Sequence, residues 1–230
     1  MKLLLFDIDG TLLHSGGAGK RAMNKAFTEI FGIQNAFKNI SMAGMTDPGI
    51  IKEALDKHHL PWNPDKVELF KHRYFQQLRI EIEFPNPRKH IKPGIPELLA
   101  YLNKDPRFWL GLLTGNWQEG ARIKLSHFGL NRYFKFGAFG DDSSDRNKLL
   151  PFALKRFEAL NTHSIDLNNV YVIGDTPLDI QCAQPYGAKT IGIATGGHSL
   201  DELRQEVPDY VFSDLSDLHS FLEIFEDDGS

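Results

Sequence analysis

Two acidic residues near the start of the chain have the spacing of a site for metal-assisted chemistry. Asp7 and Asp9 follow the apolar run of residues 3–6, and Gly10 comes next. Such a run is typical of a strand buried on both faces of a parallel sheet, and residues two apart on a strand point to the same side. Because a buried carboxylate is costly to ionise without compensation, the expected partner is a divalent cation, which prefers oxygen ligands. In the alternative interpretation, one acid caps the next element and the other is solvated.

A second pair of acids supports the same kind of site. Asp175 and Asp179 follow the apolar run 170–173 at the start of an expected helix, where residues four apart share a face. Thr114 likewise follows the apolar run 108–113. The carboxyl ends of parallel strands lie along one edge of a sheet, and ligands bind outside that edge, so we expect these side chains to converge. Asp179 has an equally good alternative role as a helix-start acid favoured by the helix dipole.

The elements that position these residues alternate along most of the chain. From about residue 89 onward, apolar runs predict strands and amphipathic stretches predict helices. The expected strands are 108–113, 133–139, 170–173, 189–194 and 210–212, and the expected helices begin near 93 and cover 118–128, 149–160, 180–186 and 215–225. Together with residues 3–6, this alternation predicts an α/β fold, a doubly wound parallel sheet with helices on both faces.

An all-helical segment interrupts the alternation after the first strand. Apolar residues recur at helical spacing in 20–31, 47–57 and 64–82. Asp47 followed by Pro48 is typical of a helix N-cap and first helical position. We therefore expect two domains: a Rossmann-like core of residues 1–14 and 89–230, and an inserted helical domain of residues 15–88.

The bulk composition excludes several classes of protein. A net charge of −4 gives no general attraction to nucleic acid or to an anionic membrane. Cys182 is the single cysteine, so the chain has no intramolecular disulfide framework. No apolar stretch approaches the roughly 20 residues that span a bilayer, and the N-terminal run lacks the features of a signal peptide. We expect a cytoplasmic protein without nucleic-acid or membrane partners, either a monomer or a homodimer.

The motifs resemble those of the haloacid dehalogenase (HAD) superfamily, in its phosphatase branch. The segment that carries the first acids, Asp7-Ile8-Asp9-Gly10-Thr11-Leu12, is similar to the first motif of that family. Thr114, followed by Gly115 and Asn116, resembles the second motif, and Gly174-Asp175 with Asp179 resembles the fourth. The helical segment resembles the cap domain of the phosphoglycolate-phosphatase-like group. The resemblance therefore extends over nearly the whole chain.

The third motif of the family, usually a lysine ahead of a helix, has two candidates in this chain. Lys148 has the expected side-chain chemistry, and Arg146 has a guanidinium fork that suits phosphate oxygens. Arg146 is slightly favoured because it stays in the loop ahead of the helix, whereas Lys148 can already point to solvent from the first turn. We expect the residue that does not bind phosphate to be a solvated surface charge.

The resemblance implies a role for each acid. Asp7 would attack phosphorus and form an aspartyl-phosphate, and Asp9 would protonate the leaving oxygen and then activate a water. Mg²⁺ would be held by Asp7, the backbone carbonyl of Asp9, and Asp175, with Asp179 binding directly or through water. The remaining motif residues would hold the phosphate oxygens: Thr114, Gly115, Asn116, and Arg146 or Lys148.

The expected function is that of a Mg²⁺-dependent phosphatase acting on a small phosphorylated metabolite, such as phosphoglycolate or a sugar phosphate. Thr46 lies in a segment that faces the substrate in relatives, although a role as a helix cap is at least as good. A sugar-phosphate mutase of the same fold is one alternative. A non-catalytic binding module is another, but such a protein is expected to lose an essential acid, whereas Asp7, Asp9 and Asp175 are all present.

Overall fold

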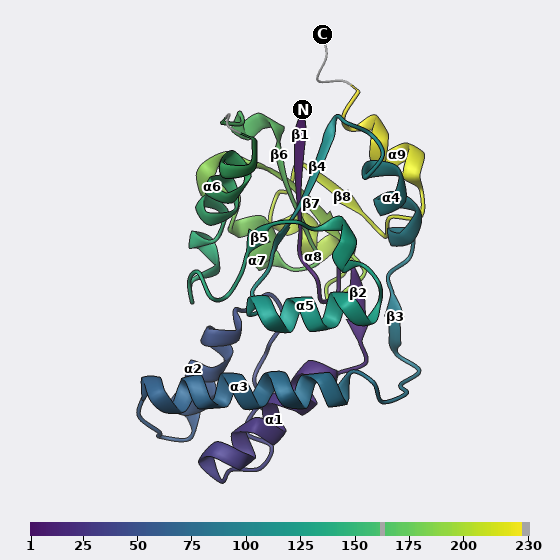
Figure 1. The fold of residues 1–230 in the computed structure, drawn as a ribbon. Coiled ribbons are helices and arrows are strands. Elements are labelled where there is room, and N and C mark those ends of the chain that lie inside the picture. Colours follow the sequence, from purple (N-terminus) through teal and green to yellow (C-terminus); the bar gives the residue numbers. More distant parts are fainter. Residues whose placement is uncertain (162–163, 227–230) are drawn as a thin grey trace.

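Parallel strands form the centre of the upper half of the molecule as it is drawn in Figure 1. The computed structural model describes residues 1–161 and 164–226. Within these ranges, six strands pair in the order β5-β4-β1-β6-β7-β8, and every neighbouring pair is parallel. Their bounds are Lys2–Phe6 (β1), Phe108–Leu113 (β4), Gly137–Ala138 (β5), Val170–Gly174 (β6), Lys189–Ile193 (β7) and Tyr210–Phe212 (β8). The predicted parallel α/β sheet is thereby confirmed.

The first strand occupies the position at which the strand order reverses. β1 pairs with β4 on one side and with β6 on the other, and Phe6 is in register with both Leu112 and Ile173. From β4 the sheet continues to β5, and from β6 it continues in the opposite direction to β7 and β8. Ligands of open parallel sheets bind in the crevice at such a reversal, outside the carboxyl ends of the strands. Asp7 therefore lies at the expected crevice.

Helices cover both faces of the sheet, because alternate strand residues point to opposite sides. Leu4 and Phe6 pack with α4 (Ile95–Leu102), α5 (Gln118–His127) and α9 (Leu218–Glu223). Leu3 and Leu5 face α6 (Leu150–Asn161) and the region of α7 (Pro177–Gln181). α8 (Leu200–Gln205), which the sequence pattern did not predict, packs against β7. No helix of residues 1–161 or 164–226 is long and apolar enough to cross a membrane.

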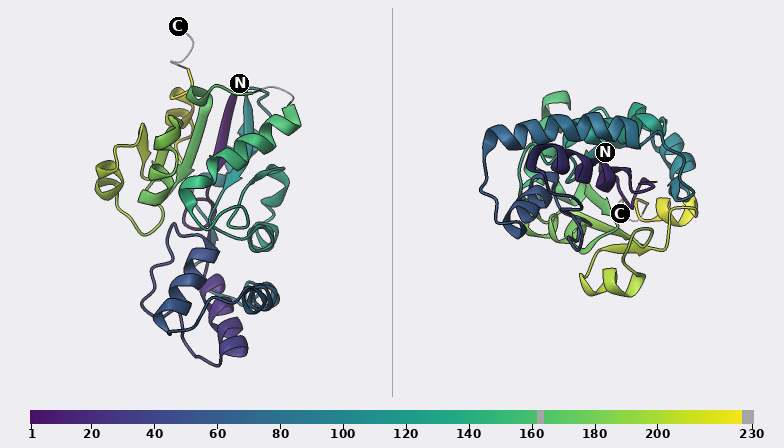
Figure 2. Two further views of the ribbon diagram at one scale, coloured as in Figure 1. Left: turned by 90° about the vertical axis from the view of Figure 1, so that its left-hand side faces the viewer. Right: turned by 90° about the horizontal axis from the view of Figure 1, so that it is seen from below.

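A separate group of helices lies beyond the carboxyl ends of the strands (Figures 1 and 2). It contains α1 (Ala18–Phe31), α2 (Asp47–Lys57) and α3 (Pro64–Glu81), which share their own apolar core around Phe27, Phe37 and Phe70. Two short antiparallel strands, β2 (Leu13–Ser15) and β3 (Lys89–Ile91), connect this helical unit to the sheet. These connecting strands were not predicted.

Some predicted elements are shorter in the structure. The strand expected over 133–139 is limited to β5 and follows a 3-10 helix, Asn131–Tyr133. The prediction of one helix over 180–186 is wrong, because α7 ends at Gln181 and a 3-10 helix, Gln184–Tyr186, follows. Pro185 explains the interruption, because proline lacks a backbone N–H and its ring clashes with the preceding helical turn.

The first residue of α2 also differs from the prediction. Thr46, rather than Asp47, is the N-cap, and its Oγ1 accepts a hydrogen bond from the backbone N–H of Gly49 at 3.1 Å. Asp47 is therefore the first helical residue, which leaves its carboxylate available for contacts outside the helix.

Candidate active site

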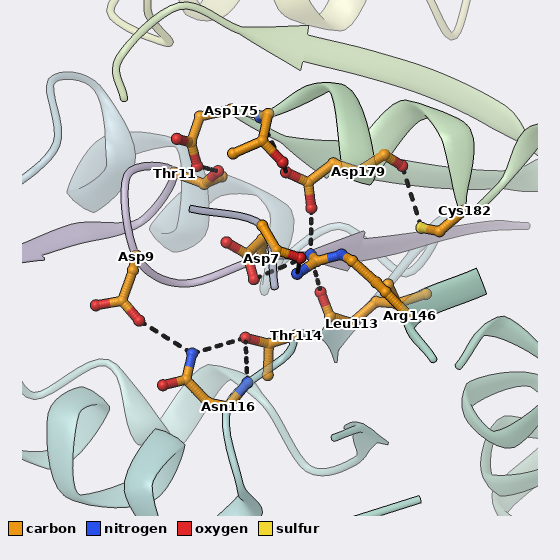
Figure 3. A network of polar contacts seen from close by, with 12 residues as sticks. Asp7, Asp9, Thr11, Leu113, Thr114, Asn116, Arg146, Asp175, Asp179 and Cys182 are labelled. Carbon is orange, nitrogen blue, oxygen red and sulfur yellow. Dashed lines mark hydrogen bonds and ion pairs between the residues drawn. The ribbon is translucent and has the colours of Figure 1, made fainter. Parts of the chain in front are cut away.

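Carboxylates from separate parts of the chain converge at the end of β1 (Figure 3). Asp7 follows β1, Asp175 follows β6, and Asp179 lies in α7. One carboxylate oxygen from each lies within 4.8 Å of the others, and the three residues are only 5%, 3% and 1% exposed. The convergence predicted from the ends of the strands is therefore present.

The electrostatics of this cluster fit a divalent cation. Burial raises the pKa of Asp7 to about 6, against the opposing charge of Arg146. Burial also raises the pKa of Asp175 well above its ordinary value, and the nearby charge of Asp179 adds to this. Buried acids that repel one another favour neutral forms unless a cation compensates them. An all-oxygen donor set suits a hard ion such as Mg²⁺ or Ca²⁺.

Arg146 is the basic residue in contact with this cluster. It begins a 3-10 helix, Arg146–Lys148, whose N-cap Asp145 accepts a hydrogen bond from the backbone N–H of Asn147 at 3.0 Å. Its Nη2 lies 3.2 Å from Asp7 Oδ1 and also contacts the carboxylate of Asp179. Burial disfavours its charge, but Asp179 and Asp7 hold the pKa of Arg146 above its usual value. Among the described residues, its Nε is a buried side-chain nitrogen without a partner.

The structure corrects the alternative assignment to Lys148. Its side chain is 70% exposed, and its ammonium lies 3.8 Å from Asp145, away from the acidic cluster. Arg146 and Lys148 stand two residues apart in one tight turn and point in different directions. Lys148 is therefore a solvated surface charge, and Arg146 occupies the position beside Asp7.

Asp9 turns away from the cluster and faces a different set of partners. Its Oδ2 accepts hydrogen bonds from Asn116 Nδ2 at 3.0 Å and from Lys124 Nζ at 2.5 Å. The chain turns directly after Asp9 at Gly10, whose φ of +94° suits glycine. A Cβ at Gly10 would also collide with the carboxylate of Asp175. The two acids of the first motif thus serve two neighbouring regions of one site.

Sequence analysis did not find Lys124. This lysine is 5% exposed, and its ammonium also donates to Asn116 Oδ1 at 2.6 Å. It lies on the buried face of α5 beside Ala121 and Leu125. A lysine at an apolar position of an amphipathic helix is the signal that could have found it, because a buried ammonium needs acceptors.

The loop after β4 holds the predicted phosphate ligands next to Asp9. Thr114 is fully buried, and its Oγ1 accepts a hydrogen bond from Asn116 Nδ2 at 2.9 Å. Gly115 lies against the helical unit: its carbonyl accepts from the backbone N–H of Asp47 at 2.7 Å, and a Cβ there would collide with the carbonyl of Met45. This loop therefore connects the sheet to the segment ahead of α2.

The structure does not support Thr46 as a substrate ligand. Its hydroxyl donates to the carbonyl of Ser144 at 2.7 Å and accepts from Gly49, so it caps α2 and holds that helix to the core. The neighbouring Asp47 lines the cavity instead.

A cavity of about 440 Å³ lies between the sheet and the helical unit. Its sheet side carries Asp7, Asp9, Asp175 and Arg146, and its helical side carries apolar residues together with Asp47 and Tyr74. Lys20, Lys92 and Lys124 also line it. This volume is suited to a small molecule.

Comparisons with known proteins show the family of the chain. The family described as haloacid dehalogenase-like hydrolase matches residues 4–193. A phosphoglycolate phosphatase of Aquifex aeolicus is 27% identical over 228 residues, covering 97% of each chain. A hydrolase from Pseudomonas syringae superposes with a TM-score of 0.69 at 22% identity, covering 97% of this chain and 99% of that one. A proposed beta-phosphoglucomutase from Bacteroides vulgatus gives 0.72 at 18% identity, covering 99% and 89%.

The two structural likenesses show the fold alone, since both identities are low. The family match is more informative, because it spans the strands and loops that carry Asp7, Thr114, Arg146 and Asp175. The predicted resemblance is thereby confirmed, and the chain belongs to the haloacid dehalogenase-like hydrolases.

Proposed function

We propose that this protein is a Mg²⁺-dependent phosphatase that hydrolyses a small phosphate monoester through an aspartyl-phosphate. The observation that carries this proposal is the position of Asp7, which lies at the reversal of the sheet between Arg146 and the buried acid Asp175. The names of relatives such as the Aquifex aeolicus phosphoglycolate phosphatase support the same reaction class.

In this mechanism Asp7 is the nucleophile, and its carboxylate oxygen attacks phosphorus. Arg146 holds the equatorial phosphate oxygens with its guanidinium and keeps the carboxylate of Asp7 oriented. Thr114 and the backbone of Gly115 and Asn116 bind the remaining oxygens. Such positioning and charge neutralisation are the main demands of phosphoryl transfer.

Asp9 is the general acid and base. It donates a proton to the leaving oxygen and later takes one from the water that hydrolyses the aspartyl-phosphate. Its separate orientation toward Asn116 and Lys124 keeps it apart from the acidic cluster, as this second role requires.

Mg²⁺ would be held by Asp7, Asp175 and the backbone carbonyl of Asp9, and it would neutralise charge on the phosphate. Asp179 lies beside this site and contacts the residues around it. One of its oxygens already contacts Arg146, and the other accepts from the backbone N–H and hydroxyl of Thr176 at 3.0 and 2.7 Å. Residues 15–88 would act as a cap that excludes bulk water from the cavity.

Hydrolysis of p-nitrophenyl phosphate, with Mg²⁺ or with EDTA, tests the proposal. We expect free phosphate only with the metal, and at least an approximately 10³-fold loss of turnover in Asp7→Asn with an unchanged circular dichroism spectrum. Appreciable hydrolysis by a folded Asp7→Asn variant would exclude Asp7 as the nucleophile. Assaying a sugar phosphate for isomerised product instead of free phosphate separates the mutase alternative.

A further inference from the structure

The cavity contains polar atoms that the phosphate chemistry above does not use. Tyr74 of α3 is 1% exposed and lines the cavity, and its hydroxyl makes no hydrogen bond with another described residue. Asp47 accepts a hydrogen bond from the backbone N–H of Trp117 at its Oδ2, at 2.8 Å, whereas no described donor reaches its Oδ1. Polar atoms that face a cavity without a protein partner are available to bind a ligand there.

Both residues are held firmly in place. The ring of Tyr74 packs between aromatic neighbours, with ring centroids 5.6 Å from Phe75 and 5.8 Å from Trp117. Gly19 and Gly120 leave space beside the hydroxyl, because a Cβ at either position would lie within 4 Å of it. Asp47 is fixed at two points, through its backbone N–H to Gly115 and through its carboxylate to Trp117.

These residues lie on the leaving-group side of the cavity. Burial raises the pKa of both Asp47 and Tyr74, and the nearby charge of Asp9 adds to both effects. Asp9, which would protonate the leaving oxygen, is therefore close to both residues. A group that leaves past Asp9 therefore meets Asp47 and Tyr74 on the helical side and Lys124 on the sheet side.

The charges in this region disfavour an anionic leaving group. Lys124 is already paired with Asp9 and Asn116, so an incoming carboxylate would meet the like charges of Asp47 and Asp9. Lys20 and Lys92 also line the cavity, and Lys92 already donates to the carbonyl of Thr195 at 2.5 Å. A neutral hydroxyl can donate to Asp47 Oδ1 and accept from Tyr74, which gives both atoms a partner.

We propose that Asp47 and Tyr74 select a neutral, hydroxyl-bearing leaving group, such as a polyol or sugar, over one that carries a carboxylate. This inference rests on the proposed phosphatase function and narrows it. It departs from the substrate in the names of the relatives, because phosphoglycolate has a carboxylate on its leaving group.

Two substrates of nearly equal size isolate the effect: hydroxyethyl phosphate and phosphoglycolate. We expect kcat/KM for hydroxyethyl phosphate to exceed that for phosphoglycolate by at least about tenfold, because a site built to hydrogen-bond a hydroxyl discriminates against a group that leaves its polar atoms unpaired. Tyr74→Phe and Asp47→Asn should each reduce the ratio of kcat/KM for hydroxyethyl phosphate to that for phosphoglycolate by about fivefold or more.

Matched controls are Tyr101→Phe, in α4, and Asp65→Asn, in the first turn of α3; neither residue lines the cavity. Both should keep the ratio of the unmodified protein. Because each ratio compares two substrates in one preparation, a partly unfolded variant does not change it.

The inference is overturned if the unmodified protein prefers phosphoglycolate, or if Tyr74→Phe and Asp47→Asn give the same ratio as the controls. In both cases hydrolysis of p-nitrophenyl phosphate would still support the phosphatase proposal. If no ester releases phosphate, the phosphatase proposal fails and this inference fails with it.

Discussion

Replacing Arg146 by methionine removes the guanidinium from the acidic cluster while preserving much of the side-chain volume. Asp7 and Asp179 then lose the cation that contacts them, and the carbonyl of Gly44 loses the donor that Arg146 provides at 2.9 Å. The lost contacts are almost wholly buried, since Arg146 is 6% exposed. Solvent therefore has little access with which to replace them.

The expected effect on stability is large. Breaking a buried ion pair by removing one partner costs about 3–5 kcal/mol. In a chain of this size, 1 kcal/mol corresponds to about 2–4 °C in Tm, so the metal-free Arg146→Met variant should melt roughly 6–20 °C below the unmodified protein. Mg²⁺ should recover part of this loss, because an ion bound only by the folded state stabilises it. Turnover should fall about 10²–10³-fold, as when one group that stabilises transition-state charge is removed.

Differential scanning calorimetry with EDTA and with Mg²⁺, together with the phosphate-release assay, measures both effects. Lys148→Met is the matched control, because it removes a cation from the same turn at an exposed position and should change stability by less than about 0.5 kcal/mol. Arg146→Lys keeps a charge but loses the fork, so it should lie between the two. The reasoning is refuted if Lys148→Met loses turnover while Arg146→Met keeps its stability and activity.

Two further predictions concern the contact between the helical unit and the core. Burial raises the pKa of Asp47 to about 7, so the folded protein holds this proton more tightly than the unfolded chain, and its stabilising effect is lost as the pH rises through about 7. In urea unfolding without metal, the unmodified protein should lose more unfolding free energy between pH 5 and 8 than Asp47→Asn does, by on the order of 2–3 kcal/mol. Equal losses in the two proteins would contradict this. Gly115→Ala should lower stability by about 1–3 kcal/mol, because its Cβ would collide with the carbonyl of Met45. Gly197→Ala should not lower stability, because no atom lies within 4 Å of the added Cβ. Equal melting temperatures for the two variants would exclude the collision at Gly115.

Features that depend on local pattern were predictable from the sequence. The apolar run of β4 gave the correct bounds, Phe108–Leu113, because an unbroken hydrophobic segment between polar turns has few alternatives to a buried strand. The convergence of Asp7, Asp175 and Asp179 followed from topology, since parallel strands end at one edge of a sheet.

Features that depend on long-range contacts were not predictable. The pairing of β2 with β3 joins three-residue segments far apart in the sequence, and neither is long enough to give a periodic signal. The choice between Arg146 and Lys148 depends on the orientation of a single 3-10 turn, which composition does not determine. Lys124 was missed because its partners, Asp9 and Asn116, come from two other loops.

Arg146 also shows why the acidic cluster and the helical unit cannot vary independently. One guanidinium contacts Asp7 and Asp179 and donates to the carbonyl of Gly44, in the segment that leads into α2. A lysine, with a single compact ammonium on a flexible stem, cannot reproduce this fixed fork. A displacement of the segment that holds Asp47 therefore disturbs the residue that orients the nucleophile, which couples the leaving-group side of the cavity to the phosphate side.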